Sequence, residues 1–274
     1  MKKSIFDFSG KTAVVTGGSG VIGGAICRGL AAAGANVVIV ANTQMGKAQV
    51  IADEIRSAGG SASVVQADVL ARDSLRKLAE DVIGDFGTVD LLVNGAGGAK
   101  KEATTSKELS FFDLPEEAVR NVLDLNFLGT FFACQVFGKI MVEQGRGAVL
   151  NISSLGAVRP LTRSVAYSAG KAAVTNFTQW LAVHFSQEYQ AKIRVNAIVP
   201  GFFLTEQNRF LLTDEITGEL TERGQRIIRQ TPMGRFGSPD ELVPPALFLL
   251  SDAASFIHGE TLVIDGGLNA YGGV

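Results

Sequence analysis

The chain is poor in the residues that build metal sites and disulfide frameworks. Among its 274 residues are only 2 cysteines and 2 histidines. Cys27 and Cys134 lie far apart, each within an apolar helical pattern, and their spacing matches neither a metal site nor a disulfide framework. We therefore expect two buried free thiols and no bound metal.

An excess of charge of either sign is also missing. The chain carries 25 basic and 27 acidic residues, for a net charge of −2, so no polybasic surface indicates nucleic acid or anionic lipid as a partner. Residues Met1–Asp7 lack the apolar run of a signal peptide. No uncharged apolar run reaches the length of about 18 residues that a membrane span needs. The sequence predicts a cytoplasmic protein with no nucleic-acid partner and no membrane partner.

Apolar residues and glycines are abundant instead. The chain is 46% hydrophobic and has 32 glycines, a globular composition with many tight turns. A length of 274 residues suffices for one large α/β domain with a well-buried core. No repeat, linker or low-complexity segment divides the sequence, so we predict a single domain over residues 1–274.

Apolar, β-branched runs alternate with longer helical patterns along the chain. Strands are predicted over Thr12–Thr16, Asn36–Ala41, Ser61–Ala67, Val89–Asn94, Ala148–Ser153, Ile193–Val199 and Thr261–Asp265, and helices over about 21–33, 44–58, 71–86, 115–144 and 164–190. Strands that are apolar throughout and separated by helices indicate a parallel sheet covered on both faces. Right-handed crossovers then give a Rossmann-type, doubly wound α/β fold of about seven strands. The more charged segment 202–236 is predicted to form a flap over one edge of the sheet.

The first predicted strand runs into a glycine-rich turn and then a helix. Gly18, Gly20 and Gly23 fit the pattern G-x-G-x-x-G in this context. Such a turn brings the backbone close to a dinucleotide diphosphate and directs helix N-terminal amides toward it. A turn needed only for packing is the simpler alternative. We predict a cofactor site that includes Gly17, Ser19, Gly20, Val21, Ile22 and Gly23.

The ends of the next strands extend this predicted site. At the end of the second strand, Ala41 stands where an acid would favour NAD, and Asn42 follows it. The glycine turn contains no arginine that would favour NADP, so the choice between NAD and NADP stays open. After the third strand, Asp68 and Val69 are candidates for the adenine site, although Asp68 could equally cap the following helix. After the fourth strand, the small residues of Asn94–Gly97 keep the backbone open, so Asn94, Ala96 and Gly97 join the predicted cofactor site.

Tyr167 and Lys171 are the candidates for proton transfer. They lie four residues apart, which places them on one face of a predicted helix. A cation near a phenol favours the phenolate, so the pair is suited to a carbonyl/alcohol reaction. Ser154 ends the fifth strand, thirteen residues before Tyr167. Asn126 lies in an apolar helical run, where a buried amide either is satisfied within the fold or anchors a water.

Taken together, these motifs closely resemble the short-chain dehydrogenase/reductase family from Gly10 to Gly267. The resemblance implies an NAD- or NADP-dependent oxidoreductase acting on CH–OH groups and assembled as a homotetramer, with the helices at 115–144 and 164–190 as interface candidates. Tyr167 would be the general acid/base, and Ser154 would hydrogen-bond the substrate oxygen. Lys171 would lower the pKa of Tyr167 and hold the nicotinamide ribose. The remaining implied roles are a relay water on Asn126 and cofactor contacts from Tyr167, Lys171, Pro200, Gly201 and Thr205.

Two features depart from the usual pattern of the family. Val21 replaces a glycine in the first turn, and Gly95 replaces the second asparagine of the Asn-Asn-Ala-Gly motif. Both changes leave the catalytic residues intact, but they affect the expectation of which groups hold the diphosphate.

Several longer stretches also resemble the short-chain-type D-mannonate oxidoreductases, or fructuronate reductases. These stretches are 95–98, 159–163, 202–209 and 231–237. The resemblance implies a sugar-acid substrate, D-fructuronate or D-mannonate, whose carboxylate one or two of Arg159, Arg163 and Arg209 would bind. The flap cations Arg223, Arg226 and Arg229 complete a polar rim, although solvated surface charge is the simpler interpretation of each.

Three alternatives stay open at this point. Two are other short-chain reductases, one like gluconate 5-dehydrogenase and one like 3-oxoacyl carrier-protein reductase. The third is a non-catalytic dinucleotide sensor, which would have little reason to keep Asn126, Ser154, Tyr167 and Lys171 in register.

Overall fold

A seven-stranded parallel sheet forms the centre of the protein in the computed structural model, which describes residues 6–189, 192–205, 212–214 and 217–273. The strand order is β3-β2-β1-β4-β5-β6-β7. The strands are β1 (Thr12–Thr16), β2 (Asn36–Ala41), β3 (Ser61–Gln66), β4 (Leu91–Asn94), β5 (Arg146–Ile152), β6 (Lys192–Pro200) and β7 (Thr261–Ile264). The predicted doubly wound α/β fold is confirmed, and each predicted strand agrees with the structure to within two residues at either end.

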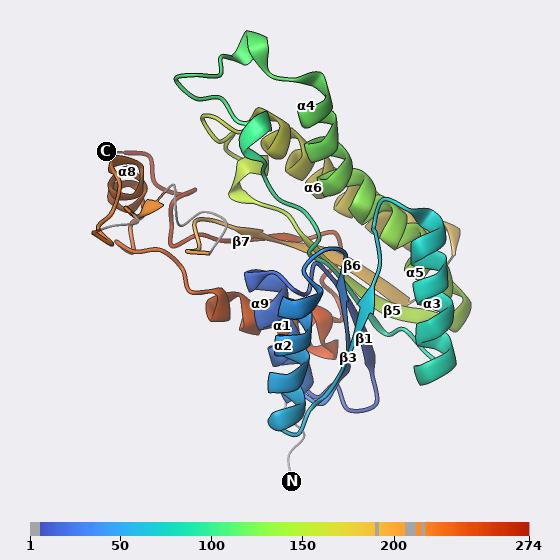
Figure 1. Cartoon of the computed structure of the whole chain (residues 1–274). Coiled ribbons are helices and arrows are strands. Elements are labelled where there is room, and N and C mark those ends of the chain that lie inside the picture. The colour runs from blue at the N-terminus through green and yellow to red at the C-terminus, as the bar shows by residue number, and fades with distance from the viewer. Residues whose placement is uncertain (1–5, 190–191, 206–211, 215–216, 274) are drawn as a thin grey trace.

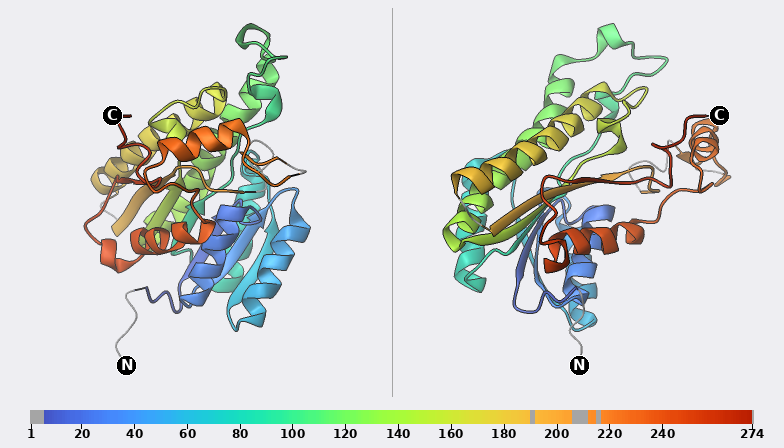
Figure 2. Two further views of the ribbon diagram at one scale, coloured as in Figure 1. Left: turned by 90° about the vertical axis from the view of Figure 1, so that its left-hand side faces the viewer. Right: turned by 180° about the vertical axis from the view of Figure 1, so that it is seen from behind.

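Helices cover both faces of this sheet (Figures 1 and 2). On one face lie α1 (Val21–Ala32), α2 (Met45–Ser57) and α9 (Val243–Leu250), and on the other lie α3 (Arg72–Phe86), α5 (Gly129–Gln144) and α6 (Val165–Glu188). Among the described residues, α4 (Glu116–Leu123) leads into α5, and α8 (Glu222–Gln230) lies beside the C-terminus. Helix α9 falls outside every helix predicted from the sequence.

The sheet is apolar on both faces because each strand contributes to two cores. In β1, Val15 packs into the core under α1 and α9, whereas its neighbour Val14 packs into the core under α3 and α5. Successive side chains of a strand point to opposite faces, so a strand covered on both sides reads as a continuous apolar run. This shared sheet supports our proposal that residues 1–274 form one domain.

The chain changes direction across the sheet at β1. This strand pairs with β2 on one side and with β4 on the other, both in parallel. The connections that follow β2 and β4 therefore run toward opposite edges of the sheet, and they leave a crevice beyond the carboxyl ends of the strands. Any ligand of such a sheet is expected there.

The predicted helix at 115–144 is interrupted in its middle. A π-helical segment, Asp124–Leu128, separates α4 from α5. By length and composition alone, the helical stretch Glu116–Gln144 could span a membrane: its most apolar 18-residue window has a mean hydropathy of 1.4, and 44% of that window is buried. Its inward residues Phe137 and Met141 are fully buried in the core against the sheet, as expected for a core helix.

The predicted flap at 202–236 is described only in part. Residues 206–211 and 215–216, and with them Arg209, lie outside the described residues. In the rest, Phe203 bridges to Gly237, and Thr213 bridges to Leu220 ahead of α8. Figure 1 shows α8 and the C-terminus together beyond the carboxyl end of β7, on the side of the sheet where the crevice opens.

Candidate active site

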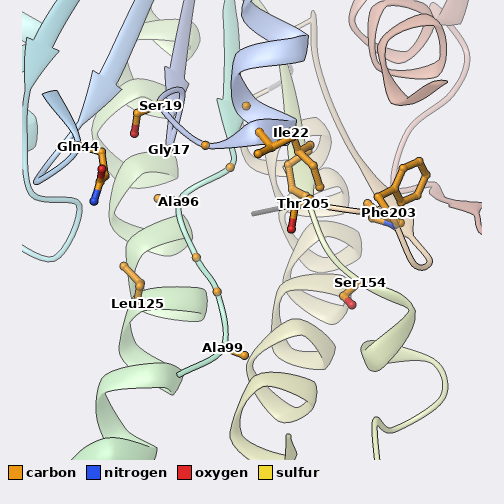
Figure 3. Close-up of a pocket in the computed structure, with 18 of the residues that line it drawn as sticks. Gly17, Ser19, Ile22, Gln44, Ala96, Ala99, Leu125, Ser154, Phe203 and Thr205 are labelled. Atoms are coloured by element: carbon orange, nitrogen blue, oxygen red, sulfur yellow. The ribbon is translucent and has the colours of Figure 1, made fainter. Parts of the chain in front are cut away.

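The crevice is a cavity of about 860 Å³. Its walls come from the glycine turn, from the ends of β2 to β6 and from α6 and α8. It brings together nearly all the predicted cofactor residues: Gly17, Ser19, Gly20, Val21, Ile22, Gly23, Asn42, Asp68, Val69, Ala96, Gly97, Tyr167, Lys171, Pro200, Gly201 and Thr205. In Figure 3, Ser19 and Gln44 lie on one side of Gly17 and Ala96, while Thr205, Phe203 and Ser154 lie on the other.

The glycine turn has the shape that a diphosphate requires. Gly17 adopts a left-handed backbone with φ of 65°, and the amide of Gly20 donates to its carbonyl at 3.0 Å. A Cβ at Gly23 would collide with that same carbonyl oxygen, so α1 can start this close to β1 only with glycine there. Gly20 caps α1 without a side-chain acceptor, which leaves the first amides of the helix available to an anion. The turn therefore fits a nicotinamide dinucleotide.

Asp68 lies at the predicted adenosine end. Its Oδ1 accepts the amide of Leu70 at 2.9 Å, whereas the cap residue of α3 is Ala71. Asp68 therefore orders the turn before α3 instead of capping that helix, and it still lines the cavity. Asn42 is exposed at the end of β2, where no carboxylate follows the strand, so the structure adds no preference between NAD and NADP.

Asn94 does not line the cavity. Its side-chain amide donates to Oδ1 of Asn151 at 2.9 Å and to Sγ of Cys134 at 3.2 Å, and the residue is 1% exposed. The side chain of Asn94, predicted to contact the cofactor, instead connects β4 to β5 and α5. Ala96 and Gly97, which follow it, do face the cavity.

Ser154, Tyr167 and Lys171 meet on one wall of the cavity. The phenol of Tyr167 hydrogen-bonds with the hydroxyl of Ser154, which also accepts the amide of Gly156 at 3.1 Å. Nζ of Lys171 lies 5.9 Å from the centre of the Tyr167 ring and donates to the carbonyl of Ile152 at 2.7 Å. The predicted helical spacing therefore does bring the phenol and the ammonium to the same site.

Burial shifts the pKa values of both groups toward their neutral forms. Loss of solvation raises the pKa of Tyr167, and the hydrogen bond with Ser154 offsets only part of this effect. Burial lowers the pKa of Lys171 to about 8. The expected lowering of the Tyr167 pKa by Lys171 is wrong for this structure, because the ammonium is directed at the Ile152 carbonyl and desolvation is the larger effect.

Asn126 lies behind the cavity wall, within the π-helical segment. Its amide donates to the carbonyls of Gly98 at 2.9 Å and Val122 at 2.8 Å, and its Oδ1 accepts the amide of Gly98 at 3.1 Å. A Cβ at Gly97 would lie 2.6 Å from this Oδ1 and 3.1 Å from Nζ of Lys171. Asn126 is therefore a satisfied buried amide that fixes the loop after β4 against the site.

A second cavity, of about 510 Å³, adjoins the first. Arg159 and Arg163 line it, but neither lines the main cavity. The guanidinium of Arg159 donates to the carbonyl of Leu268 at 2.7 Å. Four residues line both cavities: Leu155, Leu161, Phe202 and Arg223. In the sequence, the charge and spacing of Arg223 do not distinguish it from Arg226 or Arg229, so it is predicted only as one of several flap cations.

Comparisons with known proteins identify relatives over almost the whole chain. The family model described as enoyl-(acyl carrier protein) reductase matches residues 18–269. An uncharacterized oxidoreductase of Bacillus subtilis strain 168, UxuB, is 47% identical over 277 residues and 98% of each chain. A Haemophilus influenza protein provisionally assigned as a D-mannonate oxidoreductase, crystallised with NAD, is 40% identical with a TM-score of 0.91 over 98% of each chain. A gluconate 5-dehydrogenase of Burkholderia cenocepacia J2315, crystallised with NADP and tartrate, is 30% identical with a TM-score of 0.84, over 98% of this chain and 99% of the other.

Proposed function

Since the chain belongs to the short-chain dehydrogenase/reductase family and is an oxidoreductase of CH–OH groups that uses NAD or NADP, we propose that it interconverts D-fructuronate and D-mannonate. The observation that carries this proposal is the hydrogen-bonded pair of Tyr167 and Ser154. The pair lines the main cavity together with the glycine turn, and this cavity adjoins a second one that is lined by arginines. The related Haemophilus protein, provisionally assigned to D-mannonate, supports the choice of substrate.

The residues of the cavity divide the work of this reaction. A bound nicotinamide supplies or accepts the hydride. Ser154 hydrogen-bonds the ketone oxygen and holds it beside the phenol of Tyr167. In the reducing direction, Tyr167 donates its proton to that oxygen as the alcohol forms. Its raised pKa keeps the phenol protonated, which suits this direction.

Lys171 and the glycine turn position the reactants. The amides at the start of α1 would hold the diphosphate, and Lys171, which lines the same cavity as Gly97 and Tyr167, would hold the nicotinamide ribose. Asn126 keeps the loop at Gly98 in place behind them. Holding reactants in register in this way accounts for a large part of enzymatic rate enhancement.

A substrate panel run with NADH and NADPH in parallel tests the proposal. D-fructuronate is expected to give the highest kcat/KM, followed by 5-keto-D-gluconate. An acyl thioester is expected to be poor, because an apolar pocket would suit an acyl chain better than this cation-lined one. The proposal would be abandoned if purified protein oxidised neither cofactor with D-fructuronate and reduced neither with D-mannonate.

Reduction of 5-keto-D-gluconate is the second candidate. It is favoured by the Burkholderia gluconate 5-dehydrogenase, which was crystallised with NADP and the dicarboxylate tartrate. Both candidates are sugar acids, and so both place a carboxylate in the same cavity. A higher kcat/KM on 5-keto-D-gluconate than on D-fructuronate would decide for this alternative.

A further inference from the structure

Arg223 stands at the junction of the two cavities. It lies in the first turn of α8 and lines both the main cavity, with Ser154 and Tyr167, and the second cavity. The start of α8 is fixed: the hydroxyl of Thr221 accepts the amide of Gly224 at 3.1 Å, and the amide of Thr221 donates to Leu212 at 3.0 Å. The guanidinium is therefore carried on an ordered helix end and can hold a ligand group in one position.

This guanidinium has no anion to balance it within the described part of the chain. Its Nε is buried and makes no hydrogen bond. Burial, together with repulsion from Arg163 and Arg226, lowers the pKa of Arg223. The acid nearest in sequence, Glu222, lines the second cavity but is paired with Arg226 at 2.5 Å. A cation that is partly desolvated beside other cations is costly unless an anion joins it.

The other cations of the junction are less suited to bind a substrate acid. Arg159 donates to the Leu268 carbonyl and faces only the second cavity. Arg163 is exposed, and its charge adds to the potential around Arg223. Among the described arginines of this junction, only Arg223 lines both the main cavity and the second cavity.

We propose that Arg223 binds the carboxylate of the sugar-acid substrate and that Arg163 strengthens the site electrostatically. The ketone and the carboxylate of a hexuronate stand at opposite ends of a short hydroxylated chain. The ketone would then lie at Ser154 and Tyr167, and the carboxylate would reach the cavity junction. A guanidinium binds a carboxylate through two parallel hydrogen bonds, which would satisfy the buried Nε. This inference rests on the proposed class of substrate, a sugar acid.

Substitutions of Arg223 test the role. Arg223→Met is expected to lower kcat/KM on the preferred sugar acid roughly 10- to 150-fold, mainly through KM, since hydrogen bonds to charged groups contribute about this much. Arg223→Lys should recover part of the loss, because it keeps the charge without the two-pronged geometry. Cofactor Kd and melting temperature should match those of the wild type. Arg229→Met, an exposed cation of the same helix that lines neither cavity, is the matched control.

The outcomes separate this role from the proposed substrate. If the wild type prefers a sugar acid other than D-fructuronate and Arg223→Met loses activity on that acid, the substrate proposal fails and the role of Arg223 stands. If D-fructuronate is the substrate and Arg223→Met keeps wild-type kcat/KM, only the role of Arg223 is overturned. If the enzyme acts only on neutral ketoses and Arg223→Met keeps the wild-type kcat/KM on them, both the substrate proposal and the role of Arg223 are overturned.

Discussion

Burial moves Tyr167 and Lys171 toward their neutral forms, and this decides what each can do. A raised pKa keeps the Tyr167 phenol protonated at neutral pH, so it carries the proton that the ketone oxygen receives, whereas a pKa of about 8 means that Lys171 loses its proton near neutral pH. Helical spacing predicted that the two groups are neighbours, and they are. It could not predict the sign of the shift at Tyr167, because the shift depends on how much water the folded walls exclude.

Removal of the Tyr167 hydroxyl should abolish the reaction and leave the cofactor site intact. Tyr167→Phe keeps the ring and loses the group that moves the proton, so we expect turnover to fall by about 10²–10⁴-fold. Binding of NADH or NADPH, measured by fluorescence titration, should be unchanged. Tyr271→Phe is the control, because Tyr271 is 41% exposed and lines neither cavity. Undiminished turnover in Tyr167→Phe would contradict the assigned role.

The buried ammonium of Lys171 should make stability depend on pH. In the unfolded chain its pKa is near 10.5, and in the native protein it is about 8. Between these values the unfolded state binds more protons, so the native protein gains stability as the pH rises. Lys171→Met lacks this titration. We expect the unfolding free energy of the wild type, relative to Lys171→Met, to increase by roughly 1–3 kcal/mol between pH 7 and 10.

Urea unfolding of both proteins across this pH range measures the effect. All other titrating groups are common to the two proteins and cancel in the difference. A difference that stayed flat, or that fell as the pH rose, would show that Lys171 is not desolvated in the native state.

Among the elements, the strands were predictable and the irregular helical segments were not. β1 and β2 agree with their predicted bounds because continuous β-branched runs have one stable arrangement, in the middle of a covered sheet. The π-helical segment at Asp124–Leu128 shifts the hydrogen-bond register without changing the apolar pattern, so periodicity does not reveal it. Helix α9 starts at Val243 with Pro244 and Pro245 in its first turn, where proline is tolerated although it normally indicates a helix end.

The same contrast appears in the site. The glycine turn, Ser154, Tyr167 and Lys171 lie at strand ends or one helical turn apart, so local spacing was enough to bring them together. Arg223 reaches the cavity only through the packing of α8 and of the loop at Leu212. Long-range packing of this kind is absent from local sequence patterns.

The π-helical segment gives Asn126 its structural importance. Replacement by leucine keeps a similar volume but removes the hydrogen bonds to the partly buried backbone of Gly98 and to the buried carbonyl of Val122. We expect Asn126→Leu to lose about 2–4 kcal/mol of unfolding free energy and to be less active, because the loop after β4 loosens beside the site. Asn121→Leu, on the exposed side of α4, should cost under 1 kcal/mol. Equal stability of the two variants in urea unfolding would contradict this account.

At the scale of the whole molecule, one face of α6 points to solvent with large apolar side chains. Trp180 is 54% exposed and Val183 is 55% exposed, and Tyr189, which follows the last residue of α6, is 50% exposed. The Trp180 ring stacks on His184 at 4.6 Å between centroids, which holds this face in a fixed shape. Ordered apolar surfaces of this kind indicate contact with another protein. We propose that this face of α6 packs against a second copy of the chain within a homotetramer.

Light scattering after size exclusion tests this assembly. The wild type should elute with a mass near four times 28.8 kDa. Trp180→Glu places a carboxylate in the middle of the apolar face, and because a desolvated unpaired charge opposes association, it should shift the mass toward the dimer or monomer. Leu70→Glu adds the same charge to an exposed apolar position in the turn before α3 and should leave the mass unchanged. A wild type of 28.8 kDa, or a Trp180→Glu variant that stays tetrameric, would remove α6 from the interface.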